Sequence, residues 1–287
     1  MIPAAFEYDR ASSVDEAIDL LQKYGSDAKL LAGGHSLIPT MRLRLARPSN
    51  VIDIGRIPEL SFIRDDGDTL VIGANTTHDA IASSPVVQAK APVLASAAAS
   101  IGDLQVRNVG TIGGAVAHAD PAADYPAAIV TSEAVIVAKG PNGERTISAA
   151  DFFVEIFTTA LQEEEVITEI RVPAQPANSG SVYHKFPNPA SGYAVVGCAA
   201  MVTVENGSCA DVRVGFTGLA NTAFRDSGVE NALKGQAPDE SNISAAADNA
   251  GAGQTMLSDI FASDTYRAHL AKVYAKRALI AAAANAD

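Results

Sequence analysis

Two glycine-containing stretches carry the residue types in this chain that are best suited to bind an anion. The first is Ala32–Ser36, with the sequence Ala-Gly-Gly-His-Ser, between a predicted strand (29–31) and a predicted helix (37–45). Gly33 and Gly34 allow a sharp turn and bring backbone N–H groups close to a ligand. The next helix begins with unpaired N–H groups and a partial positive charge. This arrangement suits a diphosphate, although turns of this kind are more often purely structural.

The second stretch, Arg107–Asp124, again combines glycines with polar side chains. Asp120 precedes a proline and marks a turn. Asp124 has two readings that stay open, because its carboxylate can accept hydrogen bonds from ligand hydroxyl groups or can cap the helix that follows it. Three residues again permit a close approach of the backbone to a ligand, namely Gly110, Gly113 and Gly114.

Neither stretch is a common nucleotide fingerprint or a metal site. The first lacks the Gly-Lys-Ser/Thr of a P-loop and the Gly-x-Gly-x-x-Gly of a Rossmann fold. The two cysteines, Cys198 and Cys209, match no metal-ligand spacing, and an iron–sulfur cluster normally needs four ligands. We therefore expect no cluster and no metal in this chain, and two reduced, buried thiols.

Composition narrows the class of protein. The chain has 287 residues, of which 48% are hydrophobic and 19% charged, so we expect a soluble globular protein with more than one core. Its net charge of −12 argues against nucleic acid and anionic membranes as partners. No apolar run is long enough for a transmembrane segment, and the N-terminus lacks the features of a secretory signal.

The elements that position the two stretches fall into three predicted domains. Residues 1–55 read as a small β-α-β unit, with a capping box at Ser13 and Ser36 as the N-cap of its second helix. Residues 56–175 read as a second α/β unit. Residues 176–287 follow a Pro/Gly-rich linker and read as a three-stranded antiparallel sheet, with a hairpin at Asn206-Gly207, and then helices.

Together with their neighbours, the two stretches resemble the paired flavin motifs of one family. Ala32-Gly33-Gly34-His35-Ser36-Leu37-Ile38-Pro39 and Thr111-Ile112-Gly113-Gly114-Ala115, followed by His118-Ala119-Asp120-Pro121, are similar to those of the FAD-binding medium subunits of molybdenum hydroxylases. The aerobic carbon monoxide dehydrogenase type is the most similar. The resemblance covers the whole chain, from Ile2-Pro3 to the tail that contains Arg277-Ala278-Leu279.

The resemblance implies an α+β fold. Two α/β subdomains would form an FAD-binding domain of the p-cresol methylhydroxylase/vanillyl-alcohol oxidase type, followed by the C-terminal sheet and helices. FAD would lie between the first two subdomains, with its diphosphate on the backbone N–H groups of Ala32–Ser36 and Thr111–Gly114, and its ring toward the third. Neither a catalytic residue nor a metal ligand is implied. The implied cofactor-binding residues are Leu31, Ala32, Gly33, Gly34, His35, Ser36, Leu37, Ile101, Gly110, Thr111, Gly113, Gly114, Ala117, Asp120, Asp124, Val166, Lys185 and Tyr193.

The resemblance alone implies a position near the flavin ring for three of these residues. Asp124 would bond the ribityl chain or the ring edge. Lys185 would lie near the N1–C2=O end of the ring and raise its reduction potential, whereas from sequence alone it is an exposed strand lysine. Tyr193 would cover one ring face, whereas its alternative is core packing beside Val195 and Val196.

The implied function is electron transfer in a multi-subunit oxidoreductase. Electrons would come from the [2Fe-2S] clusters of a small subunit, pass through FAD and leave to a quinone or another acceptor. A large subunit would hold the molybdopterin cytosine dinucleotide, in a dimer of heterotrimers that oxidises carbon monoxide. Alternatives are a medium subunit acting with N-heterocycle, aldehyde or xanthine-like substrates, and a self-contained flavin oxidase. The implied location is cytoplasmic, or at the inner face of the membrane.

Overall fold

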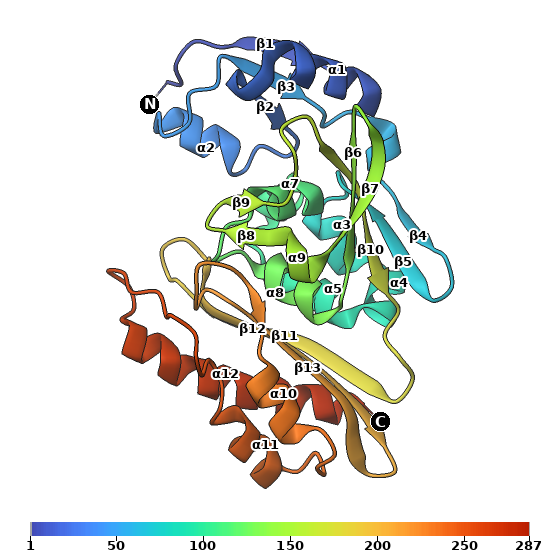
Figure 1. Cartoon of the computed structure of the whole chain (residues 1–287), viewed down its shortest axis with the longest axis vertical. Helices are drawn as coiled ribbons and strands as arrows, with labels where there is room; N and C mark the ends of the chain where they lie inside the picture. The colour runs from blue at the N-terminus through green and yellow to red at the C-terminus, as the bar shows by residue number, and fades with distance from the viewer. Residues whose placement is uncertain (1, 287) are drawn as a thin grey trace.

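The computed structural model describes residues 2–286, and it stacks three parts along its long axis (Figure 1). The N-terminal part lies at one end, a larger middle part follows, and a sheet with helices forms the other end. Each part has its own cluster of buried apolar side chains, although the clusters take in residues from neighbouring parts. No helix among residues 2–286 is long and apolar enough to cross a membrane.

The N-terminal part is a three-stranded parallel sheet in the order β1-β3-β2. Ser13 caps the first helix by accepting a hydrogen bond from the Glu16 N–H, and one face of that helix is buried. The Glu16 carboxylate turns to Ser12 instead of completing a capping box on Ser13. The elements are β1 (Glu7–Arg10), α1 (Val14–Tyr24), η1 (Gly25–Asp27), β2 (Ala28–Leu31), α2 (Leu37–Arg42), β3 (Asn50–Asp53) and η2 (Pro58–Leu60).

The middle part is a five-stranded antiparallel sheet in the order β4-β5-β10-β6-β7, with helices packed against it. The strands are β4 (Ile63–Asp65), β5 (Thr69–Gly73), β6 (Val135–Gly140), β7 (Gly143–Ser148) and β10 (Val166–Pro173), with a separate hairpin of β8 (Phe153–Glu155) and β9 (Thr158–Thr159). The helices are α3 (His78–Ser83), α4 (Pro85–Lys90), α5 (Pro92–Ser100), α6 (Leu104–Arg107), α7 (Ile112–His118), α8 (Asp124–Thr131) and α9 (Ala149–Phe152).

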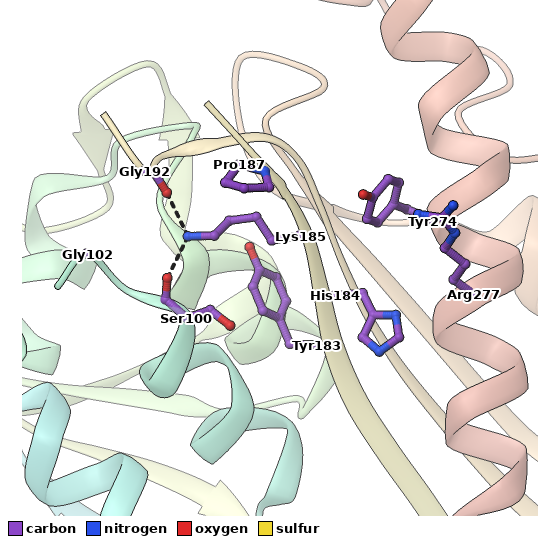
Figure 2. Close-up of a pocket in the computed structure, with 9 residues that line it drawn as sticks. All are labelled: Ser100, Gly102, Tyr183, His184, Lys185, Pro187, Gly192, Tyr274 and Arg277. Atoms are coloured by element: carbon purple, nitrogen blue, oxygen red, sulfur yellow. Dashed lines mark hydrogen bonds between the residues drawn. The ribbon is translucent and has the colours of Figure 1, made fainter. Parts of the chain in front are cut away.

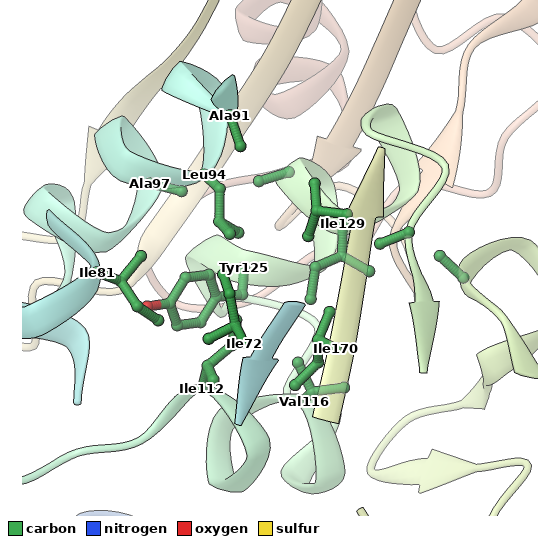
Figure 3. Packing of buried hydrophobic residues seen from close by; sticks show 14 of the residues in the cluster. Ile72, Ile81, Ala91, Leu94, Ala97, Ile112, Val116, Tyr125, Ile129 and Ile170 are labelled. Carbon is green, nitrogen blue, oxygen red and sulfur yellow. The ribbon is translucent and has the colours of Figure 1, made fainter. Parts of the chain in front are cut away.

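Helix α8 is the centre of this middle part because all of its residues are buried. Tyr125 at its start belongs to the same cluster of buried side chains as Ile72 of β5, Ile112 of α7 and Ile170 of β10 (Figure 3). Burial of one such aliphatic side chain contributes about 1.5–3 kcal/mol. Because α8 is buried on every side, its first residue, Asp124, is held at a fixed position inside the protein.

The C-terminal part is an antiparallel sheet in the order β11-β12-β13-β14, covered on one face by α12. The three long strands confirm the predicted sheet, and the two-residue β14 adds a short fourth strand. Asn206 and Gly207, both at positive φ, form the predicted hairpin turn. The elements are β11 (Ser179–Pro187), β12 (Ala194–Glu205), β13 (Ser208–Thr217), β14 (Phe224–Arg225), α10 (Ser227–Leu233), α11 (Glu240–Ala247) and α12 (Asp264–Ala284).

Candidate functional site

The two glycine stretches, which are far apart in sequence, are in contact in the fold. Gly33 packs against the backbone of Val109 and Gly110, so closely that a Cβ atom on Gly33 would lie 2.9 Å from the Gly110 Cα and would overlap the Val109 carbonyl oxygen. Gly34 has φ +72°, a conformation that glycine adopts without strain. The first stretch therefore needs glycine at 33 for contact with the second stretch and at 34 for its turn.

The first stretch presents a row of backbone donors. Within residues 2–286, none of the five N–H groups from Gly33 to Leu37 donates a hydrogen bond to a protein atom, whereas the next N–H, of Ile38, bonds the Gly34 carbonyl. Consecutive unpaired N–H groups ahead of a helix form an anion-binding concavity. These residues are partly accessible, and His35 is exposed.

The helix after this stretch differs from its prediction. Helix α2 ends at Arg42 instead of 45, because the chain turns at Arg44, which has φ +61°, and the Thr40 carbonyl accepts the N–H groups of Leu45 and Ala46. Ser36 makes no side-chain cap, so its predicted N-cap role is wrong. Its backbone is already in the helical region, where the side chain does not reach back to the second or third N–H.

The second stretch is a helix start rather than an open loop. Thr111 caps α7 through the Gly114 N–H, while the Ile112 and Gly113 N–H groups donate to Thr76 and Ala74. Each of these three N–H groups already has a protein acceptor in this fold, and the expected diphosphate contact at Thr111–Gly114 stays a prediction. Gly113 is buried, with a Cβ position 2.5 Å from that of Ala74, so packing explains its glycine.

One face of α7 remains available to a ligand. Gly114 and Ala117, one turn apart, are both exposed, whereas Gly113 and Val116 point into the core. A Cβ on Gly114 would lie 4.0 Å from the Ala32 Cβ. The Gly114 face of α7 and the first stretch thus lie side by side.

His78 supports the second stretch, and the sequence analysis did not identify it. Its N–H donates to the Gly110 carbonyl at 3.0 Å, and its ring fills the space beside the Gly110 Cα. The ring lies against Tyr125, with 3.3 Å between Nδ1 and the phenol oxygen. Burial, with the nearby charges of His35 and Arg107, lowers the pKa of His78 to about 4, so this imidazole is neutral at pH 7. The one sequence feature that could have identified His78 is its position shortly after β5, at the start of the next helix.

Asp124 and Lys185 form a buried ion pair. The Lys185 Nζ lies 3.0 Å from the Asp124 carboxylate and donates to the carbonyl oxygens of Ser100 and Gly192, each at 2.7 Å (Figure 2). The Tyr183 hydroxyl donates to the same carboxylate at 2.7 Å. Burial raises the pKa of Asp124, and the positive charge of Lys185 opposes that rise.

This ion pair excludes two roles that the sequence left open: an exposed strand lysine at 185 and a helix cap at 124. Lys185 is not an exposed strand lysine, because only 8% of its side chain is accessible. Asp124 is not a side-chain cap, since α8 has Ala123 at its N-cap position and no cap bond. The Asp124 carboxylate bonds Tyr183 and Lys185, and its expected bond to the ribityl chain or the ring edge stays a prediction.

Tyr193 lies at the end of residues 188–193, which form the tip of the β11–β12 hairpin (the 188–193 hairpin). It is 39% exposed, so core packing beside Val195 and Val196 is wrong. Burial and the charge of Asp120 raise the pKa of Tyr193, while the nearby Ser36 hydroxyl lowers it. Tyr193 therefore lies near Ser36 and Asp120, and the three residues come from all three parts of the chain.

The remaining predicted residues separate into two groups. Leu31, Ala32, Leu37, Ile101 and Asp120 are partly accessible beside these stretches, and the Ile101 carbonyl accepts a hydrogen bond from Arg107 at 3.0 Å. Val166 is only 1% exposed and packs in the core of the N-terminal part, so its expected contact with the cofactor stays a prediction. Its alternating strand position points it inward.

A shallow depression of about 610 Å³ adjoins the ion pair. It follows the outer edge of β11, between the end of α5 and helix α12. Lys185 and Tyr183 lie on one side of the strand in Figure 2, with His184 and Arg277 on the other. This volume lies within the usual range for a small-molecule site.

Taken together, these features fit an extended dinucleotide. Among the described residues, the five unpaired N–H groups suit a diphosphate, and the exposed Gly114 leaves room beside it.

Comparisons with known proteins agree with this fit over the whole chain. Residues 4–175 match the family described as FAD binding domain in molybdopterin dehydrogenase, and 181–282 match the CO dehydrogenase flavoprotein C-terminal domain. The chain is 46% identical over 282 residues to the carbon monoxide dehydrogenase medium chain of Hydrogenophaga pseudoflava, covering 98% of each chain. It is 38% identical to the 6-hydroxypseudooxynicotine dehydrogenase complex subunit alpha of Paenarthrobacter nicotinovorans, covering 97% of this chain and 95% of that one.

The fold agrees as closely. The solved structure of carbon monoxide dehydrogenase from Hydrogenophaga pseudoflava, in a form that lacks the Mo-pyranopterin moiety, aligns with a TM-score of 0.96 at 48% identity over 99% of each chain. The chain therefore belongs to the family of FAD-binding medium subunits of the molybdenum hydroxylases, with the C-terminal domain of the carbon monoxide dehydrogenase flavoproteins.

Proposed function

We propose that this chain is the FAD-carrying electron-transfer subunit of a molybdenum hydroxylase that oxidises carbon monoxide. The complex would convert carbon monoxide and water to carbon dioxide, two protons and two electrons. The observation that carries the proposal is the contact of Gly33 with Val109 and Gly110, which sets five unpaired N–H groups opposite the accessible face of α7. The likeness to the Hydrogenophaga pseudoflava medium chain supports the substrate.

The chain's residues would bind and orient the cofactor. The N–H groups from Gly33 to Leu37 would hold the diphosphate, and Gly114 and Ala117 would leave room for the chain of the dinucleotide. Tyr193 would cover the ring side of the site, next to Ser36 and Asp120. When bound, FAD supplies two-electron redox chemistry that no side chain provides.

The partners and the location belong to the same proposal. A small [2Fe-2S] subunit would donate electrons, a large subunit would hold the molybdopterin cytosine dinucleotide, and a quinone or another acceptor would receive the electrons. We place the complex in the cytoplasm or at the inner face of the membrane, as a dimer of heterotrimers. Within the chain we propose domains at 1–55, 56–175 and 176–287.

Co-expression with the large and small subunits of the same enzyme tests the proposal. The purified complex should show the absorbance of oxidised flavin, and anaerobic carbon monoxide should bleach it. A complex assembled without this chain should still have its clusters reduced by carbon monoxide but should pass electrons to a quinone much more slowly. A flavin-free complex, or unchanged quinone reduction without this chain, would refute the proposal.

A second candidate is the medium subunit of an N-heterocycle hydroxylase. The 38% identity to the 6-hydroxypseudooxynicotine dehydrogenase subunit favours it over other substrates. Anaerobic titration of the same complex with nicotine-type heterocycles separates the two candidates, because only the true substrate reduces the flavin.

A further inference from the structure

The Lys185 ammonium group has no free donor in this fold. An ammonium group has three N–H donors, and those of Lys185 reach the Ser100 carbonyl, the Gly192 carbonyl and the Asp124 carboxylate at 2.7, 2.7 and 3.0 Å. These three acceptors come from the end of α5, the 188–193 hairpin and the start of α8. Lys185 therefore joins three segments that are separate in sequence.

The charge of this lysine is balanced where it lies. The side chains of Lys185 and Asp124 are 8% and 6% accessible, and Tyr183 completes the coordination of the carboxylate. A buried, contacting pair of opposite charges has a much weaker field outside it than a single charge. A cofactor beside this pair meets a neutral unit rather than a free cation.

The Lys185 contact attaches the 188–193 hairpin to α5 and α8. Most of its hydrogen bonds are internal: the Asn188 N–H bonds the Tyr193 carbonyl, and the Asn188 side chain accepts from Ala190 and Ser191. Such bonds shape the hairpin but do not attach it to the protein. The Gly192 carbonyl, beside Tyr193, is attached through Lys185.

We propose that Lys185 is a positioning residue, which with Asp124 forms a charge-neutral tie that holds the Tyr193 hairpin against α5 and α8. It does not act as a free cation on the cofactor ring, in contrast to the role that the family resemblance implies. This inference rests on the proposed function only where the flavin potential is measured. The contacts of Lys185 are all within this chain and do not require a cofactor.

Two variants and two readouts test the tie. Lys185→Met removes the cation, and the double variant Lys185→Met/Asp124→Asn removes both charges. The first readout is cleavage of the full-length chain within the hairpin, by elastase at Ala190 or chymotrypsin at Tyr193. The second is the midpoint potential of the flavin in the assembled complex. Lys276→Met is the matched control, since Lys276 forms an exposed pair with Glu240 on α11.

We expect hairpin cleavage to be at least tenfold faster in both Lys185 variants and unchanged in the control. The flavin potential of the double variant should equal that of the wild type, because a cation and an anion are removed together. Unchanged cleavage in the double variant, or a lowered potential in it, would overturn the proposal. The double variant alone decides this if Lys185→Met, with Asp124 left unpaired, fails to fold. The cleavage measurement does not require flavin. If the wild-type complex contained no flavin, the proposed function would be refuted, and the cleavage rates would still test the role of Lys185.

Discussion

Gly33 and Val109 touch through their backbones, and no side chain fits between them at position 33. This contact joins the N-terminal part of the chain to the middle part at the point where the proposed diphosphate site lies. The site is therefore a junction between two separately folded segments, and its geometry depends on how closely they pack.

The variant Gly33→Ala should separate the two stretches. Its Cβ would overlap the Val109 carbonyl, and overpacking of this kind costs about 1–3 kcal/mol. We expect flavin affinity in the complex to fall at least tenfold, as measured by fluorescence on release of FAD, with the circular dichroism spectrum of the chain unchanged. Gly228→Ala is the control, because its nearest atom would be 3.3 Å away. Equal flavin affinity in the two variants would contradict this account.

A large side chain at Gly114 should block the cofactor without unfolding the protein. Gly114 is exposed on α7, and a Cβ there would lie 4.0 Å from the Ala32 Cβ and 2.9 Å from the Thr111 Oγ1, so Gly114→Leu would project toward the first stretch and requires only the Thr111 side chain to shift. We expect a flavin-free complex whose subunits still assemble, shown by gel filtration and the visible spectrum. Ala245→Leu, at an exposed site on α11, should retain flavin fully. Full flavin occupancy in Gly114→Leu would place the cofactor elsewhere.

His78 should make the chain less stable in acid. Its pKa is about 4 in the folded protein against an ordinary value of 6.5, so the unfolded chain binds more protons between these pH values. Stability therefore rises with pH through this window, and acidification from pH 6.5 to 4 should cost up to about 3 kcal/mol from this group alone. Urea unfolding at several pH values measures this slope, which should be smaller in His78→Gln. An identical slope in the variant would show that His78 titrates normally.

Arg267 should be essential for the stability of the C-terminal part. It is 4% exposed and donates to the Val195 and Gly218 carbonyls and to Asp259. Arg267→Met leaves these acceptors without a donor, which should lower the free energy of unfolding by about 3–5 kcal/mol. Arg277→Met removes an exposed arginine that lies over Tyr274 on the same helix, and it should cost less than about 1 kcal/mol. Similar midpoints of chemical unfolding for the two variants would contradict this ranking.

Local sequence signals predicted those elements that depend on neighbouring residues. The strand before the first glycine stretch and the Asn206-Gly207 hairpin follow from residue pattern and turn chemistry, and the structure confirms them. Helix α7 was missed because glycines at 113 and 114 suggest a loop. Contacts with Ala74 and Thr76 stabilise the helix start despite its low helix propensity.

The roles of Asp124 and Lys185 were beyond sequence reasoning for a different reason. Each residue has an ordinary local interpretation, as a helix cap or as a surface lysine, and nothing near either one indicates the other. The tertiary structure pairs them because α8 is buried and its first residue, Asp124, lies beside β11, which carries Lys185. The burial of Val166 was beyond sequence reasoning for the same reason, since it depends on the core of a neighbouring part.

By itself, the sequence determined the family, the three long C-terminal strands and the two glycine stretches, because these are encoded in local residue order. Only the tertiary structure decided which N–H groups remain unpaired, which glycines serve packing and which side chains neutralise one another. Hydrogen-bond partners and buried charges come from distant parts of the chain, so their pairing exists only once the three parts are packed together.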